Sequence, residues 1–142
     1  GLGLRDRLPG TSVRVEDALL AVHRSYLKPI RALMASVPVQ GMAHITGGGL
    51  VDNVPRILPD GVGIRVDTTS WTPGPLFACI QQAGKVDADE MYRVFNMGVG
   101  YVVIVRPKDA ARALACLRRQ RASPVVIGTA VRGRSVVTLA GL

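Results

Sequence analysis

Residues 41–59 read GMAHITGGGLVDNVPRILP and carry the clearest structural signal in the chain. Residues 42–46 form a short apolar run that is typical of a buried strand. Three glycines follow, and residues 50–53 can begin a helix. This order predicts a tight strand-to-helix connection whose backbone amides are free of surrounding side chains. Two interpretations stay open for the glycines, a binding site for phosphate or carboxylate and a purely structural turn.

The sequence around this segment predicts further strands. Residues 62–67 alternate between apolar and other side chains, which indicates a half-exposed strand. Residues 101–105, YVVIV, are dominated by β-branched side chains and give the strongest strand prediction. Residues 123–131 and 135–140 read as two more strands, joined by a tight hairpin at residues 132–134.

Helices are predicted between these strands. The segments are residues 16–21, 29–34, 75–84, 87–94 and 107–117. Asp87 and Glu90 have the spacing of a capping box at the start of the fourth helix. Residues 1–14 show no periodicity and read as an irregular segment. The irregular alternation of helices and strands predicts one α+β domain, in which a mixed β-sheet is covered by helices.

The composition indicates a basic globular domain. The 142 residues are 48% hydrophobic and 20% charged, which suits one packed domain. Eighteen Lys and Arg against ten Asp and Glu give a net charge of +8, which suits anionic partners such as nucleic acid or phosphorylated metabolites. The one basic cluster, residues 118–121, is short and lacks interleaved aromatics, so it is a poor footprint for nucleic acid.

Several residues carry little functional signal by themselves. Cys79 and Cys116 lie far apart among apolar residues, so we expect two buried thiols rather than a metal or redox site. Trp71, the only tryptophan, is expected to pack rather than stack on a ligand. No apolar run approaches the length of a membrane span, and no signal-peptide pattern opens the chain. Because the first residue is Gly1, we expect a piece of a longer chain.

The residue types near the glycines suit an anionic, amide-bearing ligand. Gly47, Gly48 and Gly49 supply the cradle. Thr46 adds a hydroxyl donor and Arg56 a planar fork for phosphate oxygens. Asn53 and Asn96 are neutral hydrogen-bond partners for amide or ribose groups. His44 can exchange a proton near neutral pH, although a lone histidine in an apolar strand is often structural.

Three segments resemble the phosphoribosylformylglycinamidine cyclo-ligase family, also called the aminoimidazole ribonucleotide synthetase family. Residues 41–59 resemble its glycine-rich signature. Residues 23–28, HRSYLK, resemble its Thr-Arg-x-Tyr-x-Lys segment, and residues 89–100, DEMYRVFNMGVG, resemble its EMYRxFNxGVG segment. The three segments occur in the family's order, and the resemblance covers essentially residues 15–142.

The resemblance implies a C-terminal domain and a ring-closing reaction. In that reaction ATP phosphorylates the formamide oxygen of formylglycinamidine ribonucleotide, and an internal nitrogen then displaces phosphate from the iminophosphate, giving aminoimidazole ribonucleotide. It also implies a cytoplasmic homodimer whose N-terminal half, absent from these residues, supplies much of the ATP and Mg²⁺ site. We therefore expect no metal ligands in this chain and no turnover by residues 1–142 alone.

The resemblance also implies roles for individual residues. His44 is expected to be catalytic. Substrate or phosphate binding is expected at nine positions: Lys28, Thr46, Gly47, Gly48, Gly49, Asn53, Arg56, Arg93 and Asn96. Lys28 and Arg93 are the weaker candidates among them, together with Tyr26 from the same matched segments. The chain departs from the family at Val22-His23, where Pro-Thr is frequent, and at Asp52, where Glu is frequent. His23 receives no role from the resemblance.

Two alternatives remain. A related superfamily member, such as formylglycinamidine ribonucleotide synthetase, shares the architecture with looser glycine motifs. A non-catalytic basic module that binds nucleic acid or a protein partner through residues 118–121 is the alternative from another class. The motifs favour the cyclo-ligase, with its own N-terminal half, the ribonucleotide and ATP as partners, and with neither specific nucleic acid nor membrane.

Overall fold

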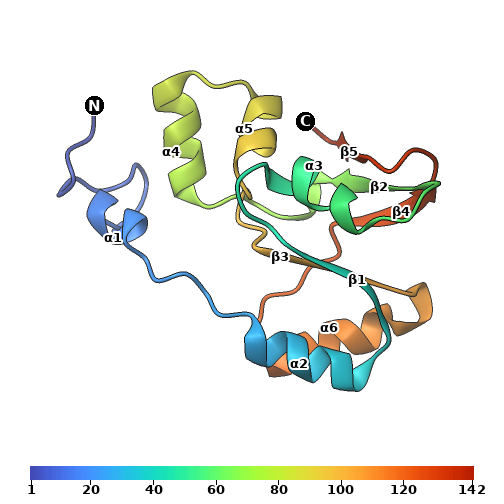
Figure 1. The fold of residues 1–142 in the computed structure, drawn as a ribbon. Helices are drawn as coiled ribbons and strands as arrows, with labels where there is room; N and C mark the ends of the chain where they lie inside the picture. Colours follow the sequence, from blue (N-terminus) through green and yellow to red (C-terminus); the bar gives the residue numbers. More distant parts are fainter.

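Two small β-sheets organise the chain, for which a computed structural model describes residues 1–142 (Figure 1). In one sheet, β1 (Val39–His44) pairs antiparallel with β3 (Tyr101–Val105). The other has the order β4 (Gly128–Arg132), β2 (Val62–Asp67) and β5 (Val137–Ala140). β2 runs antiparallel to β4 and parallel to β5, so this sheet is mixed. The α+β class is confirmed, with two sheets in place of one.

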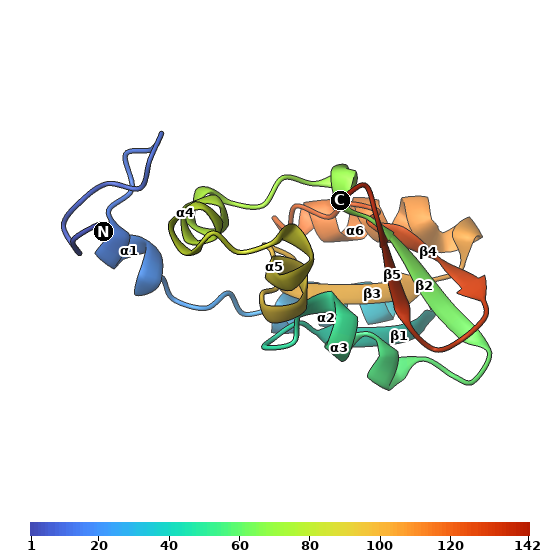
Figure 2. The same ribbon diagram turned by 90° about the horizontal axis from the view of Figure 1, so that it is seen from above.

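Two helices cover the β1–β3 sheet. α2 (Leu27–Ser36) and α6 (Ala110–Arg119) pack side by side, as Figures 1 and 2 show from two directions. Their apolar stripes meet because side chains three and four positions apart share one helix face. The resulting core cluster contains Leu33, Val37, Ala113, Cys116 and Leu117.

A second cluster lies between the sheets and the short helices that follow β1. α3 (Gly49–Asn53) and the 3₁₀ turn Pro55–Ile57 come directly after the glycine loop. Leu50 and Val54 from this region are both 1% exposed, as is Val66 from β2. The burial of these side chains is what anchors the glycine loop against the sheets.

The third cluster forms under α4 (Pro75–Gly84) and α5 (Ala88–Val94). Met91 is fully buried there, and Trp71 packs on the cluster. The Trp71 indole Nε1 donates to the Met97 carbonyl at 2.9 Å, which satisfies its polar atom. The packing role predicted for Trp71 is therefore confirmed.

The N-terminal segment extends away from these clusters. It carries α1 (Val15–Leu19), and Figures 1 and 2 both show it apart from the body of the fold. Leu20 and Val22, which connect it to α2, are 82% and 96% exposed. Two further 3₁₀ turns, Thr68–Ser70 and Pro107–Asp109, complete the element list.

The predicted hairpin at residues 132–134 is wrong. β4 begins only at Gly128, and β5 does not pair with it, because β2 lies between them. The connection passes the start of β2, where the Gly133 amide donates to the Gly61 carbonyl at 3.0 Å. Residues 133–136 therefore connect two strands that lie two strand spacings apart, about 10 Å. A tight hairpin connects neighbouring strands, which lie one spacing apart.

Other sequence predictions hold with small changes. The strands at 62–67 and 101–105 and the helix at 75–84 have the predicted bounds. α5 begins after Asp87, but no side chain caps it, so the predicted capping box does not form. Cys116 is buried as predicted, whereas Cys79 is only partly buried, and both are free thiols.

Asp67, at the end of β2, has a pKa below its ordinary value of 3.8. The Thr69 hydroxyl is the main cause, donating to Asp67 Oδ1 at 2.6 Å, and the Thr69 amide adds a second bond at 2.9 Å. Because the folded-state pKa is lowered, this contribution to stability is present above the unfolded-state pKa and is lost as pH falls through the folded-state pKa.

We expect Thr69→Val to raise the pKa of Asp67 toward its ordinary value, because the hydroxyl donor is lost. Stability should then fall less steeply on acidification. A carbon-detected NMR titration of the Asp67 carboxyl measures the pKa directly. Ser70→Ala is the matched control, since the Ser70 hydroxyl donates to the Asp67 backbone carbonyl and not to its carboxylate. An unchanged pKa in Thr69→Val would contradict the assignment.

Candidate functional site

The glycine loop joins β1 to α3 through a turn that requires glycine. Gly48 and Gly49 have φ values of 93° and 56°, in the left-handed region that other residues rarely adopt. The Gly49 amide donates to the Thr46 carbonyl at 3.1 Å, so this amide is used within the loop. α3 has only five residues, and its helix dipole adds little.

Asn53 holds the loop in place from α3. Its side chain is buried, and Nδ2 donates to the carbonyls of Gly47 at 3.1 Å and Gly49 at 2.8 Å. The Thr46 hydroxyl donates to Asn53 Oδ1 at 3.3 Å. The amide of Asn53 is thus engaged inside the chain, and its predicted contact with a ligand stays a prediction.

The three glycines have different surroundings. A Cβ on Gly49 would collide with the Tyr92 carbonyl and approach the Phe95 carbonyl to 2.7 Å, so packing on α5 requires glycine here. A Cβ on Gly48 would lie 2.8 Å from the Asp52 side chain. A Cβ on Gly47 would meet no atom within 4 Å. The structural interpretation accounts for Gly48 and Gly49, whereas only Gly47 presents an open approach to the backbone.

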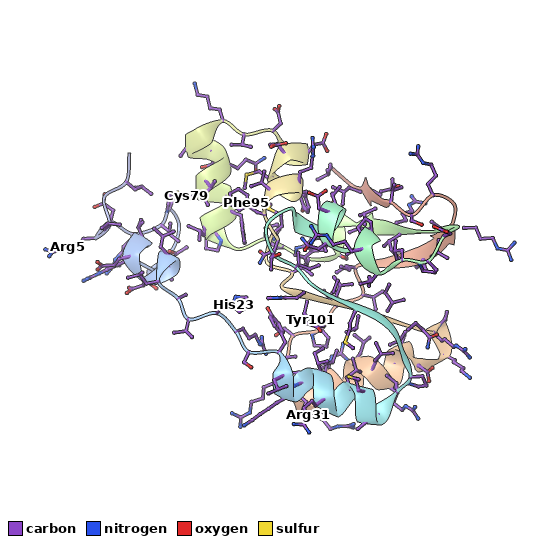
Figure 3. All side chains as sticks on the ribbon, viewed as in Figure 1. Arg5, His23, Arg31, Cys79, Phe95 and Tyr101 are labelled. Carbon is purple, nitrogen blue, oxygen red and sulfur yellow. The ribbon has the colours of Figure 1, made fainter.

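His44, at the end of β1, lies in a cluster of aromatic rings. Its Nε2 is 3.2 Å from Nε2 of His23, which precedes α2. Tyr101, opposite His44 in the strand register, stacks on it at a centroid distance of 6.0 Å. Tyr26 lies 5.9 Å from both imidazoles. Figure 3 labels His23 and Tyr101 near each other at this end of the β1–β3 sheet.

The pairing of His23 with His44 was missed by reasoning from the sequence. The two residues lie 21 positions apart, and no local pattern links them. Only the packing of the segment before α2 onto the end of β1 brings them together. The one signal in the sequence was the number of histidines, since the chain has only these two.

The remaining predicted residues are dispersed. Lys28 on α2 and Arg56 after α3 are exposed, and neither forms a hydrogen bond or ion pair with the glycine loop. Asn96 Oδ1 accepts from the Gly98 amide at 3.0 Å. Arg93 pairs with Glu90 at 3.8 Å, and both of these α5 side chains are exposed. The structure thus joins Thr46, Asn53 and the glycines directly, and leaves the binding roles of the others as predictions.

Arg93 also borders a hollow at the start of α5. The hollow has a volume of about 520 Å³ and is lined by Asp87, Asp89 and Glu90 as well as Arg93. Negative side chains outnumber the cation, so the local charge opposes a phosphate. No group of three or more His, Cys, Asp or Glu, in this hollow or elsewhere in the chain, lies close enough to hold a metal ion. No helix has both the length and the hydrophobicity needed to cross a membrane.

Comparisons with known proteins agree on one family. Residues 2–140 match the family described as AIR synthase related protein, C-terminal domain. A phosphoribosylformylglycinamidine cyclo-ligase of Bacillus cytotoxicus is 40% identical over 138 residues, or 96% of this chain and 40% of that protein. The chloroplastic enzyme of the same name from Arabidopsis thaliana is 42% identical over 135 residues, or 95% of this chain and 35% of that protein.

A third relative is more similar over a shorter region. The cyclo-ligase of Aromatoleum aromaticum is 56% identical over 102 residues, or 70% of this chain and 29% of that protein. The chain therefore spans 29% to 40% of the length of these three relatives. The resemblance inferred from the three motifs is confirmed, and the chain belongs to the family of AIR synthase related C-terminal domains.

Proposed function

We propose that this chain is the C-terminal part of an ATP-dependent ligase that cyclises formylglycinamidine ribonucleotide to aminoimidazole ribonucleotide in purine biosynthesis. The observation that carries the proposal is the identity of 40% and 42% to relatives named cyclo-ligase over nearly the whole chain. The motifs around Gly47 and Tyr92 support the cyclo-ligase over other members of the superfamily.

ATP supplies the phosphoryl group that activates the formamide oxygen in this reaction. Ring closure then forms a bond from an amidine nitrogen to the formyl carbon, breaks the bond from that carbon to the phosphorylated oxygen, and releases phosphate and one proton. The exposed imidazole of His44 is the group that we assign to this proton. Arg56 and the open backbone at Gly47 are assigned to phosphate oxygens.

We propose that metal-bound ATP is held mainly outside these residues. Mg²⁺ is usually held by carboxylates and phosphate oxygens, and this chain has no group of three or more candidate ligands. We therefore assign ATP and Mg²⁺ mainly to the N-terminal half of the proposed enzyme, which also forms the homodimer. A cytoplasmic location belongs to the same proposal.

The proposal is tested by supplying that N-terminal half. The assay measures aminoimidazole ribonucleotide formed from formylglycinamidine ribonucleotide, ATP and Mg²⁺. We expect no product from residues 1–142 alone, and product when the N-terminal half is present in the same chain or is co-expressed. A related superfamily substrate turned over in place of the ribonucleotide, or rapid turnover by residues 1–142 alone, would contradict the proposal.

Gly47→Val tests the anion cradle without disturbing the fold. Because a Cβ at Gly47 meets no atom within 4 Å, the free energy of unfolding should change by no more than about 0.5 kcal/mol. The added side chain should obstruct a phosphate oxygen, and kcat/KM of the complete enzyme should fall about 100-fold, as when one oxyanion donor is lost.

The control variant is Asp60→Asn, an exposed change in the loop before β2. It should leave both the free energy of unfolding and kcat/KM unchanged. Gly48→Val is a poorer test than Gly47→Val, since the positive φ of Gly48 and the contact with Asp52 would strain the fold itself. Full activity in a folded Gly47→Val enzyme would remove Gly47 from the site.

A further inference from the structure

The two histidines of this chain form a pair on its surface. They are the only histidines among 142 residues, and their Nε2 atoms lie 3.2 Å apart. Both residues are exposed on the surface of the chain. The pair belongs neither to the glycine loop nor to any packed core cluster.

The spacing fits two ligands of one metal ion. Imidazole nitrogens bind Zn²⁺ at about 2.0–2.1 Å, so two of them on one ion lie about 2.9 Å apart at a right angle and about 3.4 Å apart at a tetrahedral angle. The observed 3.2 Å falls between these limits. We propose that His23 and His44 bind a divalent late first-row cation, such as Zn²⁺, Cu²⁺ or Ni²⁺, through their Nε2 atoms.

Neighbouring rings hold both imidazoles near this arrangement. Tyr101 stacks on His44 with an interplanar angle of 25°, and the strand pairing of these two residues fixes its position. Tyr26 meets the edge of His23 with an angle of 69°. Figure 3 shows His23 and Tyr101 at the same end of the sheet. A partly ordered pair loses less conformational entropy on binding a metal than two free side chains do.

The ligand set determines which cations bind. Imidazole suits Zn²⁺, Cu²⁺ and Ni²⁺, whereas Mg²⁺ and Ca²⁺ require oxygen ligands. The nearest residue to His23 in sequence with a positive charge is Arg24. Its guanidinium donates to the Arg121 carbonyl at 2.7 Å, so this positive charge is engaged at the end of α6. With two protein ligands, the remaining coordination positions are left to water. The site is therefore distinct from a Mg²⁺ site for ATP and does not depend on the proposed reaction.

Metal binding replaces the hydrogen bond between the rings. The two Nε2 atoms face each other at 3.2 Å, and which of them donates depends on the tautomers of the two rings. The cation needs both Nε2 lone pairs, so each ring carries its proton on Nδ1 when the metal is bound. The metal then occupies the His44 imidazole, to which the proposed function assigns a proton, which predicts inhibition of the complete enzyme by Zn²⁺ as a secondary consequence.

Isothermal titration of the 142-residue chain with Zn²⁺ tests the site. We expect one ion per chain, with affinity reduced at least about tenfold in His23→Gln and in His44→Gln, because even outer-shell changes at metal sites cost that much. The double variant should bind at least as weakly as either single variant, since each change removes one of the two ligands. Mg²⁺ should show no heat of binding at these positions.

Cys79→Ser is the matched control, because Cys79 is a partly exposed thiol that also attracts Zn²⁺. It should leave the affinity unchanged. Substoichiometric Cu²⁺ should broaden the NMR signals of both imidazoles together. Equal Zn²⁺ affinity in the wild type and His23→Gln, loss of binding in Cys79→Ser, or broadening of one imidazole alone would overturn the proposal. Because none of these measurements uses turnover, they fail or succeed independently of the proposed function.

Discussion

Gly49→Ala is expected to destabilise the domain by about 2–6 kcal/mol, the sum of a strained backbone and an overpacked contact. Gly49 has a φ of 56°, and its Cβ would collide with the Tyr92 carbonyl of α5. These atoms belong to backbone segments, so no side-chain rotation relieves the collision. The loop would have to move away from α5 and expose Leu50, which is 1% exposed in the native fold.

Urea unfolding followed by circular dichroism measures the change. Gly47→Ala, two residues earlier, is the matched control, because its Cβ meets no atom within 4 Å and its φ is not positive. It should change the free energy of unfolding by no more than about 0.5 kcal/mol. Similar stability losses for both variants would show that the loop does not pack on α5 as described.

Asn53→Asp is expected to cost about 2–5 kcal/mol of stability, although it changes the side chain by one polar group. The substitution removes the Nδ2 donor from the carbonyls of Gly47 and Gly49. The bond to Gly49 is buried, and leaving a buried carbonyl without this partner costs about 1–3 kcal/mol. It also places a carboxylate oxygen next to those carbonyl oxygens, in a side chain that is 6% exposed.

Asp52→Asn supplies the control for this change. It is the reverse substitution at the adjacent exposed position, and we expect an effect within about 0.5 kcal/mol. Thermal and urea unfolding of both variants give the comparison. A folded Asn53→Asp chain with wild-type stability would mean that Asn53 does not clamp the loop, and would favour the predicted role in ligand binding over the structural one.

The local elements were largely predictable from the sequence. The β-branched run at 101–105 and the alternation at 62–67 each define a strand by side-chain pattern alone. Pro75 and Gly84 bound α4 because proline favours the first turn of a helix and glycine favours its end. The three motifs were likewise sufficient to predict the family, which the comparisons confirm.

Strand order was not predictable in the same way. Residues 128–132 and 137–140 have strand patterns, and their proximity in sequence favoured a hairpin. The competing arrangement places β2 between them, so that both edges of β2 find partners. Side-chain pattern determines whether a segment is extended, whereas the choice of partner depends on which edges the rest of the fold leaves open.

In the candidate site, too, some features were predictable from the sequence and others depended on the tertiary structure. The sequence by itself determined that residues 46–49 form a tight glycine connection, because only glycine tolerates such backbone angles. Only the tertiary structure decided that Gly49 packs on α5, that Asn53 clamps the loop, and that His23 meets His44. These contacts join segments distant in the chain, and their energies depend on distances that no local pattern contains.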